Sequence, residues 1–273
     1  MTAPTDHWID TPSGRLYARS WPAPAGSSDR APLVLLHDSL GSVALWRDFP
    51  AQLALAAGRQ VVAYDRLGFG QSDPHPGRLG GDFIADEARG GFAALVGHLG
   101  MERHYLMGHS VGGGMALSIA AAEPARCLGV ITISAQAFVE DRTLAGIRVA
   151  QAQFAEPGQL ARLAKHHGDK AAWVLSAWID SWLAPGFANW SLDPILPRVR
   201  CPVLTLHGER DEYGSSRHPE RIVAGVAGPA RYLPLAGYGH VPQRENPAVV
   251  LAAVSEFFAQ HGDASAGQRQ MAG

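Results

Sequence analysis

The chain has 273 residues, which is enough for one large α/β domain that carries a modest insertion. Its 47% hydrophobic and 18% charged residues are typical of a soluble globular protein and exclude the disordered, collagen-like and membrane-spanning classes. A formal net charge of -2 without a block of Lys or Arg favours a small neutral or mildly anionic ligand over nucleic acid or a membrane surface.

The first residues of the chain and its two cysteines indicate the cellular compartment in which we expect the protein. Residues Met1 to Trp8 include Asp6 and lack the cationic and apolar regions of a secretory signal, so we expect a cytoplasmic protein. Cys127 and Cys201 have no metal-ligand spacing and cannot form a disulfide framework. We expect both to be reduced thiols that pack as small hydrophobic side chains.

In chain order, the first elements form an antiparallel hairpin, with strands at 7–10 and 15–21 around the turn Thr-Pro-Ser-Gly. Short, continuous apolar runs then predict strands that are buried on both faces. These runs lie at 33–36, 61–64, 105–107, 130–133 and 203–206. Stretches with helical apolar spacing separate them, at 83–99, 112–122 and 247–260. Alternating strands and helices indicate a mostly parallel sheet with helices on both faces and an antiparallel edge.

Between residues 135 and 193 the strand pattern disappears. Five aromatic residues gather there among helical and Gly- or Pro-broken segments, namely Trp173, Trp178, Trp182, Phe187 and Trp190. We interpret 135–193 as a helical cap inserted into a core domain of residues 1–134 and 194–261. The small and polar residues 262–273 predict a disordered tail.

The strongest motif is Gly108-His109-Ser110-Val111-Gly112, which follows a predicted strand and opens a predicted helix. Glycines on either side of the serine permit the sharp turn that exposes its hydroxyl as a nucleophile. Ser110 could instead be an ordinary helix N-cap, but its strand and helix flanks favour the nucleophile.

From about residue 15 to 260 the chain resembles the α/β-hydrolase family. Besides the serine motif, the segment from Tyr64 to Asp73 is similar to the family's D-x-x-G-x-G-x-S turn. The resemblance implies an α/β-hydrolase fold, with a mostly parallel, twisted sheet of eight strands and a small helical cap after the sixth. It implies no cofactor and no metal.

The family places a His-Gly loop after the third strand, and here the loop is His37-Asp38-Ser39-Leu40-Gly41. By resemblance, the backbone N–H groups of Ser39 and Val111 would form the oxyanion hole. Asp38 stands where the family has glycine, and we expect its carboxylate to point away from the oxyanion. The Ser-Leu-Gly sequence is similar to that of enol-lactone hydrolases.

A serine nucleophile requires a base and an acid. His240 is the candidate base, since it lies in a Gly-rich loop between a strand and the last helix. Asp211 follows the seventh strand and completes the family's order of serine, acid and histidine. Glu209 and Glu212 compete with Asp211 by proximity. Glu140 and Asp141 are a second choice, since some relatives carry the acid after the sixth strand.

Serine with histidine favours acyl transfer to water, so we expect a hydrolase for small carboxylic esters or lactones. Alternatives are a C–C bond hydrolase of ring-fission diketones, a cofactor-free haloperoxidase or perhydrolase, and a non-catalytic hydrolase-fold receptor. The predicted pocket residues are Leu40, Phe138, Trp178, Trp182 and Val241. A short cap with many aromatic side chains predicts a pocket for short acyl groups. The sequence does not indicate an oligomeric state.

Overall fold

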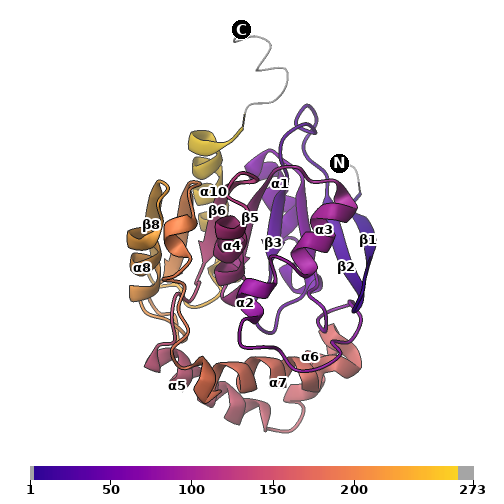
Figure 1. Cartoon of the computed structure of the whole chain (residues 1–273), viewed down its shortest axis with the longest axis vertical. Coiled ribbons are helices and arrows are strands. Elements are labelled where there is room, and N and C mark those ends of the chain that lie inside the picture. The colour runs from indigo at the N-terminus through magenta and orange to yellow at the C-terminus, as the bar shows by residue number, and fades with distance from the viewer. Residues whose placement is uncertain (1–2, 264–273) are drawn as a thin grey trace.

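An eight-stranded sheet forms the centre of the computed structural model, which describes residues 3–263 (Figure 1). Its strands are β1 (Thr5–Thr11), β2 (Gly14–Trp21), β3 (Leu33–Leu36), β4 (Val61–Tyr64), β5 (His104–His109), β6 (Cys127–Ile133), β7 (Val203–Gly208) and β8 (Ala230–Leu235). Their order is β1-β2-β4-β3-β5-β6-β7-β8. The pairs β1–β2 and β2–β4 are antiparallel, and all other neighbours are parallel. The predicted mixed sheet with an antiparallel edge hairpin is therefore confirmed.

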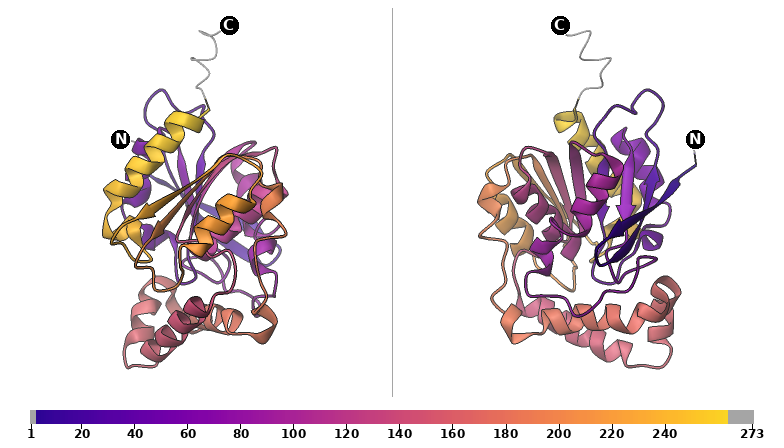
Figure 2. Two further views of the ribbon diagram at one scale, coloured as in Figure 1. Left: turned by 90° about the vertical axis from the view of Figure 1, so that its left-hand side faces the viewer. Right: turned by 45° about the vertical axis from the view of Figure 1, so that its right-hand side comes forward.

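Helices cover both faces of the sheet, as Figure 2 shows. The α-helices are α1 (Phe49–Ala57), α2 (Phe83–Asp86), α3 (Gly91–Leu99), α4 (Val111–Ala122), α5 (Asp141–Phe154), α6 (Gln159–His167), α7 (Ala171–Trp182), α8 (Arg217–Gly225), α9 (Pro242–Glu245) and α10 (Pro247–His261). Short 3-10 helices are η1 (Val43–Trp46), η2 (Gly168–Lys170), η3 (Pro185–Phe187) and η4 (Leu196–Arg198). None of the helices in the described part of the chain is both long and apolar enough to cross a membrane.

Side chains that alternate between the two faces of the central strands form two hydrophobic cores, one on each side of the sheet. In β3, Leu33 and Leu35 join the core beneath α1 and α10, whereas Val34 and Leu36 join the core beneath α3 and α4. All four residues are buried, because successive side chains of a strand point to opposite faces and both faces are covered. The continuous apolar runs in the sequence follow from this arrangement.

The predicted helix over 83–99 is interrupted. Helix α2 ends at Asp86 and α3 begins at Gly91, and between them Glu87 turns inward to accept a hydrogen bond from the Tyr64 hydroxyl at 2.7 Å. A Cβ on Gly91 would lie 2.5 Å from Glu87 Oε1, so glycine leaves the space that the carboxylate fills. The apolar periodicity continues through the break, and so the sequence pattern does not reveal it.

Helices α5, α6 and α7, which we call the cap helices, lie beyond one end of the sheet (Figures 1 and 2). The segment between β6 and β7 contains them. Trp182, Phe187 and Trp190 form one cluster there, with ring centroids 5.3–5.7 Å apart, and Phe83 of α2 packs on Phe187. These rings hold the segment to the α2 side of the sheet.

The structure differs from one expectation for the tail and places the two cysteines side by side. Asp263 falls within the predicted disordered tail, but its Oδ1 accepts a hydrogen bond from the buried Arg59 guanidinium at 2.9 Å, and its Oδ2 accepts one from the Ala31 N–H at 3.1 Å. The rest of the predicted tail, 264–273, lies outside the described residues. Cys127 and Cys201 are free, and their Sγ atoms lie 3.8 Å apart across adjacent strands.

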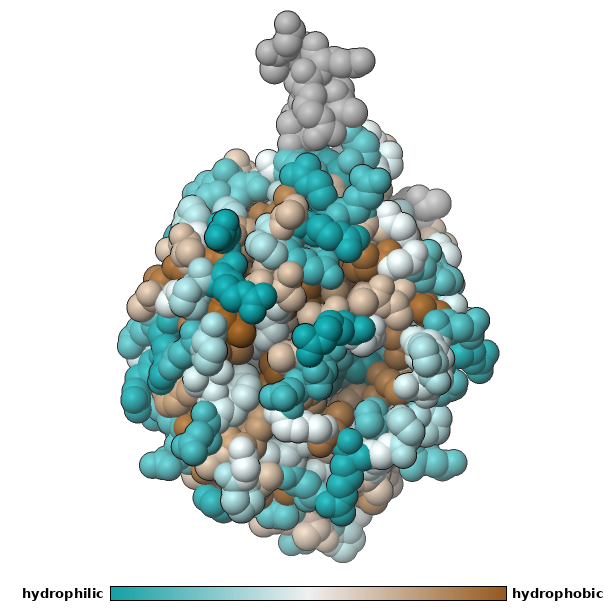
Figure 3. All heavy atoms as spheres, viewed as in Figure 1, coloured by the Kyte–Doolittle hydropathy of each residue, from teal (hydrophilic) through white to brown (hydrophobic). Residues whose placement is uncertain are grey.

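Hydrophilic and hydrophobic residues are interspersed on the face seen in Figure 3. The large hydrophobic residues that are exposed, Trp8, Leu55, Val149 and Leu160, belong to separate elements of the fold.

Candidate active site

Ser110 occupies a strained turn between β5 and α4. Its φ of 56° and ψ of -125° lie where residues with a Cβ are rarely found. The flanking positions have no room for a side chain. A Cβ on Gly108 would lie 2.1 Å from the Gly112 oxygen, and one on Gly112 would lie 2.3 Å from the Leu36 oxygen. The motif therefore lets β5, α4 and β3 approach closely and holds the serine at the carboxyl end of the sheet.

The backbone and hydroxyl of Ser110 have different partners. Its N–H donates to the Ile133 oxygen at 2.8 Å, which joins the turn to β6. Its hydroxyl donates to Gln136 Oε1 at 3.2 Å, and both side chains are almost fully buried. Gln136 follows β6, and nothing in the sequence pattern marks it as a site residue.

His240 and Asp211 are paired, and His240 lines the same cavity as Ser110. Nδ1 of His240 lies 2.9 Å from Asp211 Oδ1 and 2.8 Å from Oδ2, while Oδ1 also accepts the Tyr213 N–H at 2.8 Å. Nε2 of His207 lies 3.4 Å from Asp211 Oδ2. The Asp211 carboxylate is fully buried, and these partners keep it in one orientation.

This pair changes the acidity of both groups. Burial by itself would lower the pKa of His240, but the hydrogen bond to Asp211 and the negative charges of Asp211, Asp38 and Glu212 outweigh burial and raise that pKa. Burial would raise the pKa of Asp211, but its contacts with His240 and His207 lower it. Asp211 is thus held ionised, and a proton on His240 is stabilised.

His109, the residue before Ser110, links the histidine loop to the serine turn. Its Nε2 donates to the His240 oxygen at 2.8 Å, and its Nδ1 lies 3.9 Å from an oxygen of Asp38. The carboxylate of Asp38 thus lies near the His109 ring, and Asp38 also lines the cavity that contains Ser110. Burial, the largest influence, lowers the pKa of His109 to about 4.

The alternative acids have other partners. Glu140 accepts hydrogen bonds from the Ser215 hydroxyl at 2.6 Å and N–H at 3.0 Å, and lies 3.2 Å from His218 Nε2. Asp141 is exposed at the start of α5. An oxygen of Glu209 accepts the Gly237 N–H at 3.3 Å. The structure therefore brings Asp211 to His240 and leaves these three carboxylates elsewhere.

The loop that carries the predicted oxyanion donor is held by two buried side chains. Arg66 donates through Nη2 to the Asp38 oxygen at 2.9 Å, and its backbone N–H donates to His37 Nε2 at 3.2 Å. His167 donates through Nε2 to the Leu40 oxygen at 3.0 Å and accepts the Gly70 N–H at 2.9 Å. His167 is the last residue of α6 and is buried, because α6 packs there against the loops after β3 and β4.

Ser110 and His240 line one cavity of about 230 Å³. Its other lining residues are Asp38, Ser39, Leu40, Gln136, Thr143, Ile147, Trp178, Trp182, Glu212, Tyr213 and Val241. Four of the predicted pocket residues are among them, and Ser39 is as well. The side chain of Val111 is buried in the core, and its backbone N–H belongs to the first turn of α4, where N–H groups have no partner within the helix.

The prediction for Phe138 is wrong, because this residue does not line the cavity. Its ring packs on His218 at 4.5 Å between centroids, and the guanidinium groups of Arg217 and Arg221 lie over it at 5.2 and 4.8 Å. Helix α8 supplies all three partners, and the sequence pattern does not show which helix packs beside residue 138. Tyr213 and Thr143 do line the cavity, but neither belongs to a motif, so the sequence gives no sign of their position.

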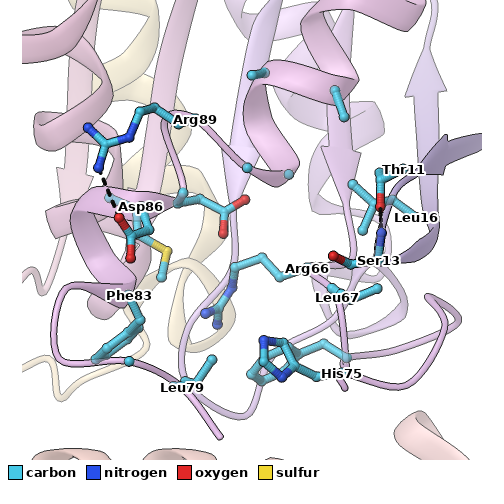
Figure 4. A pocket seen from close by; sticks show the side chains of 18 of the residues that line it. Thr11, Ser13, Leu16, Arg66, Leu67, His75, Leu79, Phe83, Asp86 and Arg89 are labelled. Atoms are coloured by element: carbon cyan, nitrogen blue, oxygen red, sulfur yellow. Dashed lines mark hydrogen bonds and ion pairs between the residues drawn. The ribbon is translucent and has the colours of Figure 1, made fainter. Parts of the chain in front are cut away.

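A larger cavity of about 410 Å³ lies between α2, α3 and the β1–β2 turn (Figure 4). Arg66 points into it, and Phe83, Leu79 and His75 lie along one side. None of Ser110, Asp211 and His240 lines this cavity, so its greater volume does not make it the site of serine chemistry. Within residues 3–263, no three His, Cys, Asp or Glu side chains are placed to hold a metal ion.

Comparison with known proteins gives the family. The sequence profile of the alpha/beta hydrolase fold matches residues 31–155. Human serine hydrolase BPHL is 30% identical over 220 residues, which cover 76% of this chain and 72% of that protein. The chain belongs to the α/β-hydrolase family.

Other hydrolases are similar over shorter stretches or in fold. The 2-hydroxymuconate semialdehyde hydrolase of Pseudomonas sp. (strain CF600) is 37% identical over 97 residues, 35% of this chain and 33% of that enzyme. The crystal structure of naproxen esterase from Bacillus subtilis superposes with a TM-score of 0.72 at 21% identity, covering 94% of this chain and 92% of the esterase. This α/β-hydrolase therefore shares its fold with an esterase and a stretch of its sequence with a 2-hydroxymuconate semialdehyde hydrolase.

Proposed function

We propose that this α/β-hydrolase is a serine esterase that cleaves small carboxylic esters or lactones through an acyl-enzyme, with Ser110 as nucleophile, His240 as base and Asp211 as orienting acid. The observation that carries the proposal is the joint position of these residues. A strained serine and the histidine of a buried His–Asp pair line the same cavity.

In the proposed mechanism, His240 Nε2 takes the proton of Ser110 while the serine oxygen attacks the carbonyl carbon. The Ser110 hydroxyl now donates to Gln136, so it has to turn to His240 when substrate binds. The N–H groups of Ser39 and Val111 would stabilise the oxyanion of the tetrahedral intermediate. His240 then protonates the leaving alcohol. In the second half, His240 takes a proton from water as the water oxygen attacks the acyl carbon, and it returns that proton to the Ser110 oxygen as the bond to the acid breaks.

The cavity supports a compact substrate. Its volume of about 230 Å³ is below the usual range for drug-sized ligands, and the rings of Trp178 and Trp182 close the side formed by the cap helices. Ile147 of α5 adds an apolar contact. A short acyl group and a small alcohol fit such a space better than a long chain.

Cleavage of carbon–carbon bonds is the second candidate, favoured by the local identity to the 2-hydroxymuconate semialdehyde hydrolase. A muconate carries carboxylate charge, and the described lining residues of this cavity include Asp38 and Glu212 but no Lys or Arg. Such a substrate would meet repulsion and no cation to bind it. The ester reaction is therefore the better supported of the two.

The test is labelling with a fluorophosphonate probe together with hydrolysis of 4-nitrophenyl acetate. The wild-type protein should be labelled and active, and Ser110→Ala should lose both, with a fall in kcat on the order of 10⁶. Ser118→Ala is the matched control, because Ser118 is a buried serine of α4 whose hydroxyl bonds to the Gly114 oxygen, and it does not line the cavity. An unlabelled, folded wild-type protein would favour a receptor, and full turnover by Ser110→Ala would refute the assignment.

A further inference from the structure

The charges around the cavity have one sign. Asp38 and Glu212 line it, and the described residues of its lining include no Lys or Arg. Both carboxylates act on His240, since their charges help to raise its pKa. The field of the site is therefore negative, whereas the net charge of the whole chain is close to zero and gives no hint of it.

The carboxylates adjoin an aromatic wall. The ring of Tyr213 lies 4.8 Å from that of His240 and 5.8 Å from that of Trp178, between ring centroids. Tyr213 and Trp178 both line the cavity and are half-buried, so part of each ring remains accessible. Aromatic faces beside carboxylates attract ammonium groups through the ring quadrupole and through direct charge.

We propose that the cavity selects esters that carry an ammonium group close to the ester carbonyl. The cation would lie against Tyr213 and Trp178, within reach of Glu212 and Asp38, while Ser110 attacks the carbonyl. This inference rests on the proposed esterase function and names the substrate class of the same site. It revises the neutral or mildly anionic ligand expected from the net charge.

Three arginines lie near these carboxylates, but none lines the cavity. The buried Arg66 donates to the backbone oxygen of Asp38 at 2.9 Å and lines the separate cavity of Figure 4. Arg142 donates to the backbone oxygen of Asp211 at 3.4 Å and does not line the cavity. Arg244 lines a smaller neighbouring cavity of about 60 Å³ together with Asp38 and His109. Arg142, Arg244 and Glu212 are all exposed, so water and salt screen their charges, whereas the Asp38 side chain is 35% exposed and its charge is screened less.

Isosteric substrate pairs isolate the charge from shape. Acetylcholine and 3,3-dimethylbutyl acetate differ by nitrogen in place of carbon on the alcohol side. Phenyl 4-(trimethylammonio)butanoate and phenyl 5,5-dimethylhexanoate differ in the same way on the acyl side. We expect kcat/KM for the cationic member of at least one pair to exceed that for its neutral partner by about tenfold or more, since each nearby carboxylate contributes roughly that order of attraction at intermediate dielectric.

The preference should respond to the carboxylates and to salt. Glu212→Gln and Asp38→Asn should each reduce the cationic-to-neutral ratio of kcat/KM by roughly three- to tenfold, and added salt should reduce it further. Glu209→Gln is the matched control, since this carboxylate lies on the same loop but does not line the cavity. The control should keep the wild-type ratio.

The outcomes separate this inference from the esterase proposal. Equal kcat/KM within both pairs, with active hydrolysis of the neutral esters, would overturn the selection of cations and leave the esterase intact. A ratio that Glu212→Gln and Asp38→Asn leave unchanged would overturn the role of the two carboxylates. Loss of all four hydrolyses, with no labelling of Ser110, would refute the esterase itself.

Discussion

Replacing Asp211 with Asn tests the central pair of the site. The amide keeps the shape of the carboxylate but removes its charge, and that charge stabilises the imidazolium of His240 in the transition state. The Asp211 carboxylate is fully buried and lies 2.8 Å from His240 Nδ1. At about 4 Å between the centres of charge and an effective dielectric of about 20, the lost attraction is about 4 kcal/mol, which corresponds to about a thousandfold in kcat.

The structure adds a second signature to this loss of rate. Asp211 helps to raise the pKa of His240, so the residual activity of Asp211→Asn should reach half its maximum at a lower pH than that of the wild type. The assay is hydrolysis of 4-nitrophenyl acetate between pH 5 and 9. Asp141→Asn is the control, because Asp141 is exposed at the start of α5, and it should behave like the wild type.

Two results would contradict this role of Asp211. If Asp211→Asn stayed within tenfold of the wild-type kcat while Glu140→Gln lost activity, the acid would belong to the loop after β6. A large loss without a change in the pH profile would mean that Asp211 holds the loop in place but does not set the acidity of His240.

The pH profile, the substrate size and the serine turn each allow a further prediction. The wild-type activity should rise with pH through a midpoint above 6.5, because His240 must be neutral to act as base and its pKa is raised; a midpoint below 6.5 would contradict this. Among aryl esters, kcat/KM should be highest for acetate or butyrate and fall for octanoate and palmitate, and a maximum at octanoate would mean that the cavity is open. Gly112→Ala should lower the free energy of unfolding by about 1–3 kcal/mol, since its Cβ would lie 2.3 Å from a backbone oxygen. Gly114→Ala on the same helix is the control, because its Cβ would meet nothing closer than 3.5 Å, and denaturant unfolding should show little or no loss.

The fold and the serine turn could be predicted from the sequence because their signals are local. Strands buried on both faces give short apolar runs, and β3 and β4 lie where those runs predicted them. The glycines around Ser110 mark a turn that only glycine permits, since a Cβ at 108 or 112 would overlap backbone atoms. Such constraints act over a few residues, so they determine which residue types occur at adjacent positions of the sequence.

Other features depend on packing between distant segments, and the sequence pattern could not show them. Phe138 lies against α8 instead of the cavity, and His167 is buried because it bonds to Leu40 and Gly70, far from it in the chain. Asp263 is held by Arg59, about 200 residues earlier, although its neighbours in sequence have the composition of a disordered tail.

The sequence by itself determined the chemical groups of the candidate site and their order along the chain. Only the tertiary structure decided which carboxylate meets His240, that Gln136 holds the Ser110 hydroxyl, and that Asp38 and Glu212 make the cavity negative. The reason is physical. A motif constrains the backbone of its own residues, whereas the direction of a side chain and the field it experiences depend on whatever packs against it.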